Sequence, residues 1–336
     1  MLNKAMLIPV TLTHGGIMVN YQCTAACRHC LYACSLSRRP GYISAETIRN
    51  VCTLLRKAGC VSVHIGGGEP FLNFEGLLTS VRELLLGGVN VDYVETNAFW
   101  AHEDCAIDKL RALLSAGVNT LCISIDPFHV EYVPYGYPLR LTQLCDKAGM
   151  GYFLWRQELL PLFSALSPEQ VHDYATLKQQ IGADYVLKTA RAYGVHFGGR
   201  AINIEEDFAE RKSPHFATKL PAQSLIDGKL CRNLLSGNHF HVDMEGYYSP
   251  PGCTGLRLPL AEVVNGISEG AYPAFEALYH RGLAGLLDLA HDTGFVEDDA
   301  GYTSKCALCF HVRRHLAVQG FAELDLNHYE EALKYY

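Results

Sequence analysis

The sequence predicts an α/β protein built around a parallel sheet. From residue 16 to about residue 189, short apolar runs alternate with amphipathic stretches of helical length, which is the pattern of repeated βα units. With 49% hydrophobic residues among 336, the chain can bury one large core or two smaller ones. Six such units predict an open or partial barrel, with its chemistry at the carboxyl ends of the strands.

The apolar runs and the turn residues between them place the elements. The predicted strands are residues 17–20, 62–65, 91–95, 120–125, 152–155 and 185–188. Predicted helices span 74–86, 103–116, 138–148 and 168–181. One more helix begins at the N-cap Ser44 and stops at Gly59, with Ile48, Cys52 and Leu55 on one face.

A second region begins where the alternation stops, near Gly199. An irregular charged segment follows through Pro214, so we expect a boundary between residues 200 and 225 and two domains, 1–215 and 216–336. In the second domain, residues 239–249 predict a β-hairpin that turns at Glu245-Gly246. Helices are predicted around 274–282 and 306–318, which makes this domain a smaller α+β unit.

Composition limits the partners and the compartment. The net charge is −7, the pI is near 6.1, and no run of Lys and Arg exceeds two residues, which argues against binding to nucleic acid. No window reaches the roughly 18 apolar residues of a membrane span, and no signal peptide is evident. We therefore expect a cytoplasmic protein, in which thirteen cysteines indicate metal binding rather than disulfides.

Three cysteines follow the first predicted strand closely. Cys23, Cys27 and Cys30 have the spacing C-x3-C-x2-C, and thiolates are soft ligands that suit zinc or iron-sulfur clusters. A closed zinc site needs a fourth ligand, for which Cys34 or His29 is nearest in sequence. An iron-sulfur cubane with three protein thiolates keeps one iron open to a substrate group.

The cysteine spacing resembles the signature of the radical S-adenosylmethionine (SAM) superfamily, C-x3-C-x-aromatic-C. His29 occupies the position of the aromatic residue. The resemblance implies that Cys23, Cys27 and Cys30 hold a 4Fe-4S cluster whose open iron is chelated by the amino and carboxylate groups of SAM. It also implies that Cys34 stays off the cluster, because a fourth thiolate would exclude SAM.

The resemblance extends to the polar ends of the next strands. The segment Gly66-Gly67-Gly68-Glu69-Pro70 resembles the family's GGEP motif and implies contacts with the methionine end of SAM. The later strand ends are implied to bind SAM in the same way. The implied SAM contacts are Gly67, Gly68, Glu69, Asn97, Ser124, Asp126 and, after the fifth strand, Arg156.

A second set of cysteines lies in the C-terminal region. Cys231, Cys253 and the pair Cys306-x2-Cys309 would complete a four-thiolate site for zinc or an iron-sulfur cluster. Together with the hairpin, they resemble a twitch domain, the shortened form of the SPASM domain. This implies one auxiliary 4Fe-4S cluster that transfers electrons. For His239 and His241 in the hairpin, and for His311 and His315, we expect solvent-facing or internally paired side chains rather than zinc ligands.

Together the resemblances imply a radical SAM oxidoreductase or maturase. It would cleave SAM reductively to a 5'-deoxyadenosyl radical and oxidatively modify a peptide or protein side chain, with an electron donor such as flavodoxin or ferredoxin. Dehydrogenation of a small sugar-like or other small molecule is the alternative reaction. A non-catalytic iron-sulfur electron carrier or metal-binding module is the alternative of another class, against which the GGEP motif counts.

Overall fold

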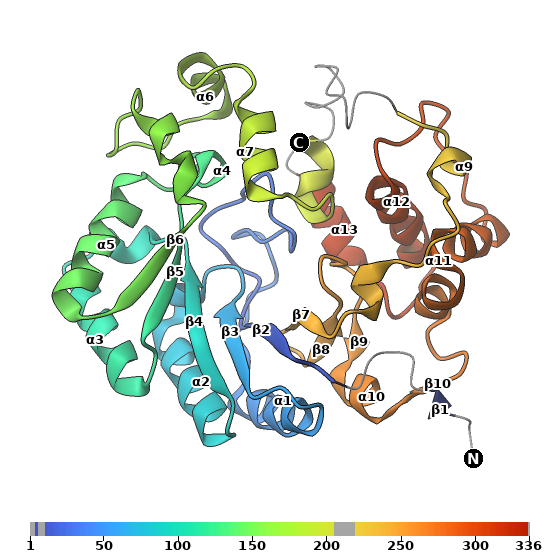
Figure 1. Ribbon diagram of the computed structural model, residues 1–336, viewed down its shortest axis with the longest axis horizontal. Helices are drawn as coiled ribbons and strands as arrows, with labels where there is room; N and C mark the ends of the chain where they lie inside the picture. Colours follow the sequence, from blue (N-terminus) through green and yellow to red (C-terminus); the bar gives the residue numbers. More distant parts are fainter. Residues whose placement is uncertain (1–3, 6–10, 205–218, 335–336) are drawn as a thin grey trace.

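An eight-stranded sheet forms the centre of the molecule. The computed structural model describes residues 4–5, 11–204 and 219–334. The strand order is β6-β5-β4-β3-β2-β7-β8-β9 (Figure 1). These strands are β2 (His14–Met18), β3 (Ser62–Gly66), β4 (Asn90–Thr96), β5 (Thr120–Ser124), β6 (Gly151–Trp155), β7 (Asn238–Val242), β8 (Tyr247–Ser249) and β9 (Leu258–Pro259). From β6 to β7 every pair is parallel, which confirms the predicted α/β class with a mostly parallel sheet.

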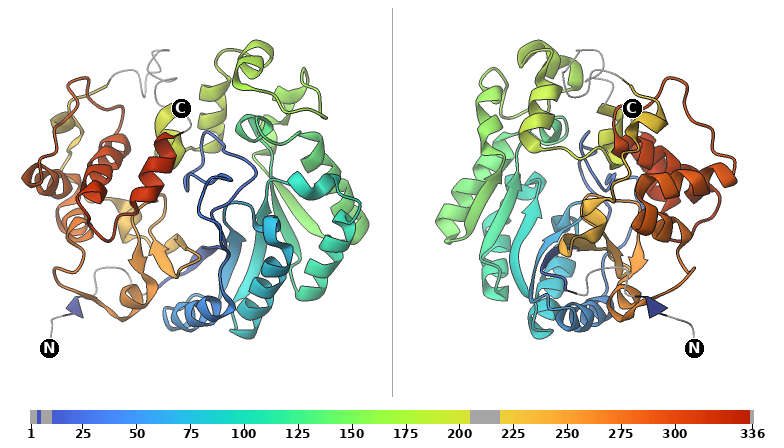
Figure 2. Two further views of the ribbon diagram at one scale, coloured as in Figure 1. Left: turned by 180° about the vertical axis from the view of Figure 1, so that it is seen from behind. Right: turned by 45° about the vertical axis from the view of Figure 1, so that its right-hand side comes forward.

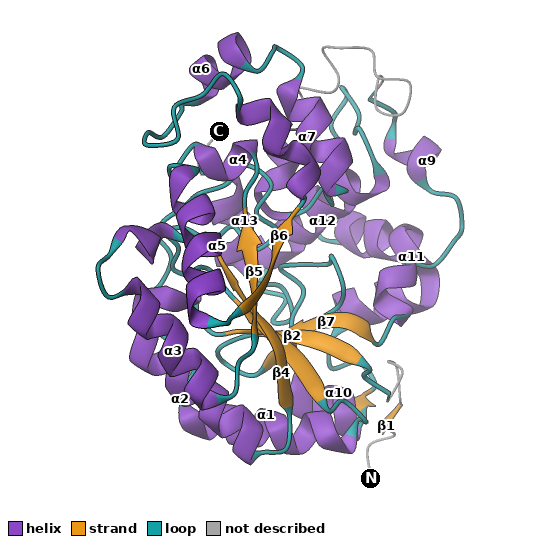
Figure 3. Ribbon diagram, turned by 60° about the vertical axis from the view of Figure 1, so that its left-hand side comes forward, coloured by secondary structure: helices purple, strands orange, loops and turns teal. Residues whose placement is uncertain are grey.

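Four helices cover one face of the parallel strands (Figures 1 and 3). They are α1 (Ala45–Lys57), α2 (Phe74–Leu86), α3 (Ala106–Ala116) and α5 (Gly136–Ala148). Ser44 begins α1 as predicted, because its Oγ accepts the N–H of Thr47 at 3.0 Å. Ile48, Cys52 and Leu55 are all buried on the inner side of α1, so the amphipathic pattern is confirmed.

The other elements are short connections and a group of C-terminal helices. The helices are α4 (Pro127–Val130), α6 (Tyr174–Gln180), α7 (Tyr185–Tyr193), α9 (Ala222–Leu225), α10 (Leu260–Asn265), α11 (Pro273–Asp292), α12 (Lys305–Val318) and α13 (Leu326–Leu333). The 3-10 turns are η1 (Pro70–Asn73), η2 (Phe99–His102), η3 (Gln157–Phe163), η4 (Gly199–Ile204) and η5 (Arg232–Leu235). A two-stranded sheet pairs β1 (Lys4–Ala5) with β10 (Ile267–Ser268).

The sixth predicted strand, residues 185–188, is wrong, because these residues lie in helix α7. A four-residue apolar run fits a strand or one side of a helix, and here Tyr185, Val186, Thr189 and Ala190 form the buried helical face. The predicted helix 168–181 is also shorter, since α6 begins only after its N-cap Asp173. The βα region therefore contributes five parallel strands instead of the expected six.

The sixth parallel strand comes from the C-terminal region. β7 lies beside β2, with Gly16 opposite His241 and Ile17 opposite Val242. It then turns into antiparallel β8 through the predicted turn, where Gly246 has φ 86°. One continuous sheet thus contains both the βα strands and the predicted hairpin.

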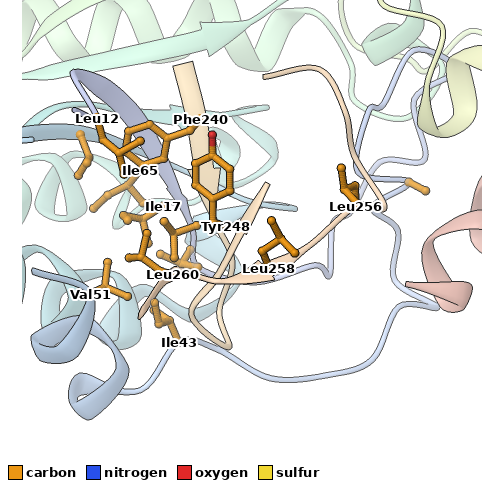
Figure 4. Packing of buried hydrophobic residues seen from close by; sticks show 14 of the residues in the cluster. Leu12, Ile17, Ile43, Val51, Ile65, Phe240, Tyr248, Leu256, Leu258 and Leu260 are labelled. Atoms are coloured by element: carbon orange, nitrogen blue, oxygen red, sulfur yellow. The ribbon is translucent and has the colours of Figure 1, made fainter. Parts of the chain in front are cut away.

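Apolar side chains from both regions pack into one core around this junction. Figure 4 shows Ile17 and Ile65 of the parallel strands beside Phe240 and Tyr248 of the hairpin. Phe240 lies over Gly15, where a Cβ would come within 2.5 Å of the Phe240 ring. Because Gly15 has no side chain, the Phe240 ring of β7 can lie against the backbone of β2.

Helices α11, α12 and α13 stand together on the side of the molecule away from α3 and α5 (Figures 1 and 2). The predicted helices 274–282 and 306–318 correspond to α11 and α12. α11 is longer than predicted because it continues past a kink at Gly282, which has φ 63° and ψ −151°. None of the helices in the described residues has the length and apolar character needed to cross a membrane.

The predicted boundary between domains 1–215 and 216–336 lies within residues 205–218, outside the described residues. The division into two domains stays a prediction. The smaller α+β C-terminal region does share its sheet with the βα region.

Candidate functional site

Cys23, Cys27 and Cys30 lie in the loop after β2, at the carboxyl ends of the parallel strands (Figure 1). Their thiols are neighbours. Burial raises the pKa of Cys23, and the nearby Cys27 and Cys30 thiols raise it further. The backbone N–H of Ala25 donates to Cys23 Sγ, and that of Cys34 donates to Cys30 Sγ, both at 3.4 Å. The structure therefore brings the three predicted ligands together in one loop.

Cys34 lies next to these three cysteines, and its thiol acts as a hydrogen-bond donor. Its thiol forms a hydrogen bond with Cys30, which lowers the pKa of Cys30 well below its usual value and raises that of Cys34. Cys34 Sγ also lies 3.8 Å from the carbonyl oxygen of Gly67. A thiol that retains its proton is a poor metal ligand.

A buried arginine, which the sequence did not identify, holds the cysteine loop in place through its backbone carbonyl groups. Arg200 in η4 donates from Nε to the carbonyl oxygen of Cys27 at 3.0 Å and from Nη2 to that of Cys34. Its backbone N–H donates to the carbonyl oxygen of Cys30 at 3.0 Å. Beside it, Gly199 has φ 54°, and a Cβ there would lie 2.2 Å from a backbone oxygen of the loop. In the sequence, Gly199-Arg200-Ala201 marked only the end of the βα pattern.

The GGEP turn after β3 packs against the chain that enters the cysteine loop. Gly68 N donates to Asn20 O at 2.9 Å, and Glu69 N donates to Gln22 O at 2.8 Å. A Cβ on Gly68 would lie 2.0 Å from Gln22 O, and Gly67 has φ +155° with Asn20 Oδ1 2.7 Å from its Cβ position. These glycines are thus required by the close approach of two protein segments.

Glu69 connects the ends of three segments. Its buried carboxylate accepts from Phe71 N at 3.1 Å, Thr96 Oγ1 at 2.9 Å and Asn97 N at 2.8 Å. Burial raises the pKa of Glu69 to about 7 against these hydrogen bonds. Asn97 in turn donates from Nδ2 to Cys23 Sγ at 3.5 Å. Glu69 and Asn97 therefore join the ends of β3 and β4 to the cysteine loop.

Asp126 lies at the end of β5 among two histidines. Its carboxylate accepts from Phe128 N at 2.9 Å and from His129 Nδ1 at 2.7 Å, and it lies 3.7 Å from His29 Nε2. Although burial opposes it, His129 and His29 hold the pKa of Asp126 well below its usual value. His129 also forms a side-chain hydrogen bond with Cys27. His29, which replaces the aromatic residue of the cysteine motif, therefore lies beside the predicted SAM contact Asp126.

Ser124 and Arg156 lie at the ends of β5 and β6. Ser124 is half-buried and stands opposite Trp155 in the sheet register. Arg156 has φ 62°, donates from Nη2 to Tyr193 O at 2.9 Å and lies 4.9 Å above the Trp155 ring. In the described part of the chain, no hydrogen bond or ion pair joins Arg156 to the cysteine loop.

The second set of cysteines surrounds a buried arginine. The hydrogen bond from Cys253 lowers the pKa of Cys231 to about 5. Burial lowers the pKa of Arg313 in α12. The nearby Cys309, Cys253 and Cys306 thiols help to raise it. Its Nε lies 3.4 Å from the carbonyl oxygen of Cys309. Cys231, Cys253 and Cys309 therefore lie near one another, and the exposed Cys306 lies three residues before Cys309 on α12.

The comparisons with known proteins bear on the first of these sites. Residues 17–140 match the model of the radical SAM superfamily. The matched segment runs from β2 into α5 and contains the three cysteines, the GGEP turn and Asp126. The matched segment covers fewer than half of the 336 residues. Among curated proteins, no sequence matches the chain.

Solved structures resemble the whole chain only distantly. Native anSMEcpe with bound AdoMet has a TM-score of 0.45 and 14% identity, over 91% of this chain and 97% of that one. Streptococcus suis SuiB bound to precursor peptide SuiA has a TM-score of 0.43 and 16% identity, over 88% and 76%. BtrN in complex with AdoMet and 2-DOIA has a TM-score of 0.42 and 11% identity, over 82% and 89%.

Proposed function

We propose that this chain is a radical SAM enzyme that oxidatively modifies a peptide or protein side chain. The observation that carries the proposal is the gathering of Cys23, Cys27 and Cys30 in one loop within the segment that matches the superfamily. A closed four-thiolate site would need Cys34, whose thiol instead donates to Cys30. Three thiolates without a fourth fit a cluster with an open iron.

The residues present fit a 4Fe-4S cluster in their chemistry. Burial removes water from the Cys23 and Cys27 thiols and raises their pKa values. A bound cation would lower these pKa values again. Cys23 Sγ accepts from Ala25 N and Asn97 Nδ2, and such hydrogen bonds tune a cluster's potential. A bound cluster would supply the electron that cleaves SAM to methionine and a 5'-deoxyadenosyl radical.

We place SAM against the strand ends next to this loop. Gly67, Gly68, Asn97 and Ser124 would contact it directly, with Arg156 at the rim. Glu69 and Asp126 already accept hydrogen bonds from backbone N–H groups, so they would both position the surrounding loops and face SAM. The support is the bond from Asn97 Nδ2 to Cys23 Sγ and the hydrogen bonds of His129 with both Asp126 and Cys27.

The second cysteine set would bind an auxiliary 4Fe-4S cluster in a twitch-like unit. Cys306 and Cys309 lie three residues apart on α12, which places them on one side of that helix, and the Cys231 thiol is near enough to help raise the pKa of Cys309. Four thiolates would leave no open iron, so this group would accept the electron that the substrate loses. A flavodoxin or ferredoxin would donate the electron for SAM cleavage.

The substrate would approach the open edge of the sheet. A hollow of about 580 Å³ runs along β6, lined by Thr142, Tyr152, Phe153, Leu154, Trp155, Arg156, Gln157 and Glu158. Phe153 and Trp155 are each 36% exposed there, and such aromatic surface would pack against an apolar side chain of a peptide substrate.

The test is anaerobic SAM cleavage by reconstituted protein. We expect 5'-deoxyadenosine in the wild type and in Cys105→Ala, which removes an exposed cysteine far from either set in sequence. Cys27→Ala should form none. Production of 5'-deoxyadenosine by Cys27→Ala at the wild-type rate, or none by any protein, would refute the proposal.

The auxiliary cluster needs its own measurement. Cys309→Ala should bind less iron than Cys105→Ala while it still cleaves SAM, because the first cysteine set is intact. Iron content equal to that of Cys105→Ala would show that Cys309 binds no cluster.

A further inference from the structure

The buried arginine among the second set of cysteines is placed to act on whatever they bind. Arg313 is 5% exposed and belongs to α12, which stands beside α13 (Figure 1). Its guanidinium carbon lies 5.7 Å from the centre of the Tyr329 ring on α13. Arg313 follows Cys309 by four residues, so the two side chains lie on the same side of α12.

The guanidinium group of Arg313 joins two of the segments that carry these cysteines. Its Nη1 donates at 2.9 Å to the carbonyl oxygen of Thr254, the residue directly after Cys253. Its Nε lies 3.4 Å from the carbonyl oxygen of Cys309, and the guanidinium also forms a hydrogen bond with the Cys309 side chain. The positive charge is therefore held against the thiol of one predicted ligand and beside the backbone of another.

This charge favours the ionised form of three of the four cysteines. The hydrogen bond with Cys231 and burial raise the pKa of Cys253, and burial raises that of Cys309, whereas Arg313 lowers both. The hydrogen bond from Cys253 is the largest cause that lowers the pKa of Cys231, and Arg313 lowers it further. Because the thiolate is the form that binds metal, the guanidinium prepares these side chains to be ligands.

A buried guanidinium needs negative charge close to it, because burial removes the water that stabilises a charge. Burial lowers the pKa of Arg313, and the Tyr329 phenol and three thiols of the second cysteine set raise it. In the described part of the chain, none of the main groups that raise it is a carboxylate. The thiolates of this cysteine set are therefore the negative partners that the fold provides for Arg313.

We propose, on the basis of the auxiliary cluster in the proposed function, that Arg313 raises the reduction potential of that cluster and so makes it a better acceptor of the substrate's electron. A 4Fe-4S cluster with four thiolates is negatively charged, and reduction adds one more negative charge. A buried guanidinium stabilises the reduced form more than the oxidised form, because the attraction grows with the charge and little water screens it. Net charge and hydrogen bonds to the sulfurs generally set such potentials.

The test is the midpoint potential of the auxiliary cluster in full-length protein reconstituted with iron and sulfide. Cys27→Ala is the background, because it disables the first cluster and leaves one electron paramagnetic resonance signal to titrate. Arg313→Gln should make electron uptake at least about tenfold less favourable, a fall in potential of about 59 mV for one electron. Arg313→Lys keeps the charge and should lie in between. Arg314→Gln is the matched control, because Arg314 is the next residue of α12 and is exposed.

A second measurement keeps Arg313 in place and so does not depend on how its variants fold. Pulsed electron paramagnetic resonance of Cys27→Ala protein with isotope-labelled arginine should show coupling between the reduced cluster and an arginine nitrogen. No coupling, or equal potentials in loaded Arg313→Gln and Arg314→Gln, would overturn the role of Arg313 and leave the auxiliary cluster in place. Folded Cys27→Ala protein without any cluster would refute the auxiliary cluster itself. Neither result bears on SAM cleavage at the first cluster.

Discussion

At the scale of single residues, the cysteine loop depends on the guanidinium of Arg200. Its bonds to the carbonyl oxygens of Cys27 and Cys34 are buried, and each buried acceptor left unpaired costs about 1–3 kcal/mol. We therefore expect Arg200→Ala to lower the free energy of unfolding by about 2–5 kcal/mol and to reduce the iron bound per chain. Urea unfolding and iron analysis measure the two effects.

Arg200→Lys is the matched variant, because it keeps the charge but loses the planar fork that reaches two carbonyl oxygens. Its stability and iron content should lie between those of the wild type and Arg200→Ala. Wild-type stability together with full iron loading in Arg200→Ala would contradict this role.

His64 of β3 and His241 of β7, whose Nε2 atoms lie 3.2 Å apart, make stability sensitive to acid. The pKa of His241 is about 3 in the folded chain, whereas an unperturbed histidine has a pKa of about 6.5. Between these values the unfolded chain binds a proton that the folded chain does not. The free energy of unfolding therefore falls as the pH is lowered from about 6.5, by up to about 1.4 kcal/mol per pH unit for each such histidine.

His241→Gln should flatten this slope in metal-free protein. Urea unfolding at several pH values between neutral and about 5 measures it, with His291→Gln as the exposed control. Equal slopes in the wild type and His241→Gln would show that His241 takes up its proton without strain in the folded state.

Residue patterns revealed the site only where its members are close in sequence or end a strand. Cys23, Cys27 and Cys30 were identifiable from their spacing, and the structure places Cys27 and Cys30 near enough to Cys23 to raise its pKa; their role as cluster ligands stays a prediction. Arg200 was not identifiable, because nothing near residue 200 indicates that its partners lie about 170 residues earlier. The SAM contacts and the auxiliary ligands stay predictions that only bound groups can test.

At the scale of elements, the kink in α11 comes from one glycine. Gly282 has φ 63° and ψ −151°, a region almost restricted to glycine, and a Cβ there would lie 2.9 Å from Lys229 O. Gly282→Ala should lower the free energy of unfolding by about 2–4 kcal/mol, from backbone strain together with the clash.

Gly294 separates these two causes. It follows α11 with φ +87°, and its Cβ position meets nothing within 4 Å. Gly294→Ala should therefore cost only the backbone term, about 1–2 kcal/mol. Thermal unfolding of both variants measures the two losses, and a loss in Gly282→Ala no larger than that in Gly294→Ala would contradict the expected added cost of the Gly282 backbone conformation and of the contact with Lys229 O.

Elements with clear caps were predictable, and short apolar runs were not. Helix α2 (Phe74–Leu86) has the predicted bounds, because Asn73 caps it and its apolar positions repeat at helical spacing. Residues 185–188 failed as a strand, because an apolar run of this length has no periodicity that separates strand from helix.

At the scale of the whole molecule, β7 joins the C-terminal region to the sheet. Its hairpin was predictable from alternation and the Gly246 turn, but its parallel pairing with β2 joins residues more than 200 positions apart. The sequence pattern of a strand predicts which of its faces is buried. It does not predict which other strand will pair with its edge.

This pairing predicts that residues 1–215 will not fold alone. Without β7, β2 becomes an exposed edge, and the space over Gly15 that Phe240 fills is empty. We expect the fragment to aggregate or to unfold without a cooperative transition, as circular dichroism during urea titration would show. A soluble fragment with a cooperative transition would establish 1–215 as an independent domain.

We propose that Cys23, Cys27 and Cys30 hold a cluster with one iron open to SAM. The most direct measurement is the electron paramagnetic resonance spectrum of reduced Cys309→Ala protein, in which the auxiliary site is disabled, before and after SAM is added. We expect a 4Fe-4S signal whose g values change when SAM is added. This signal should be absent from the double variant Cys27→Ala/Cys309→Ala. A signal indifferent to SAM, or one that survives Cys27→Ala, would contradict it.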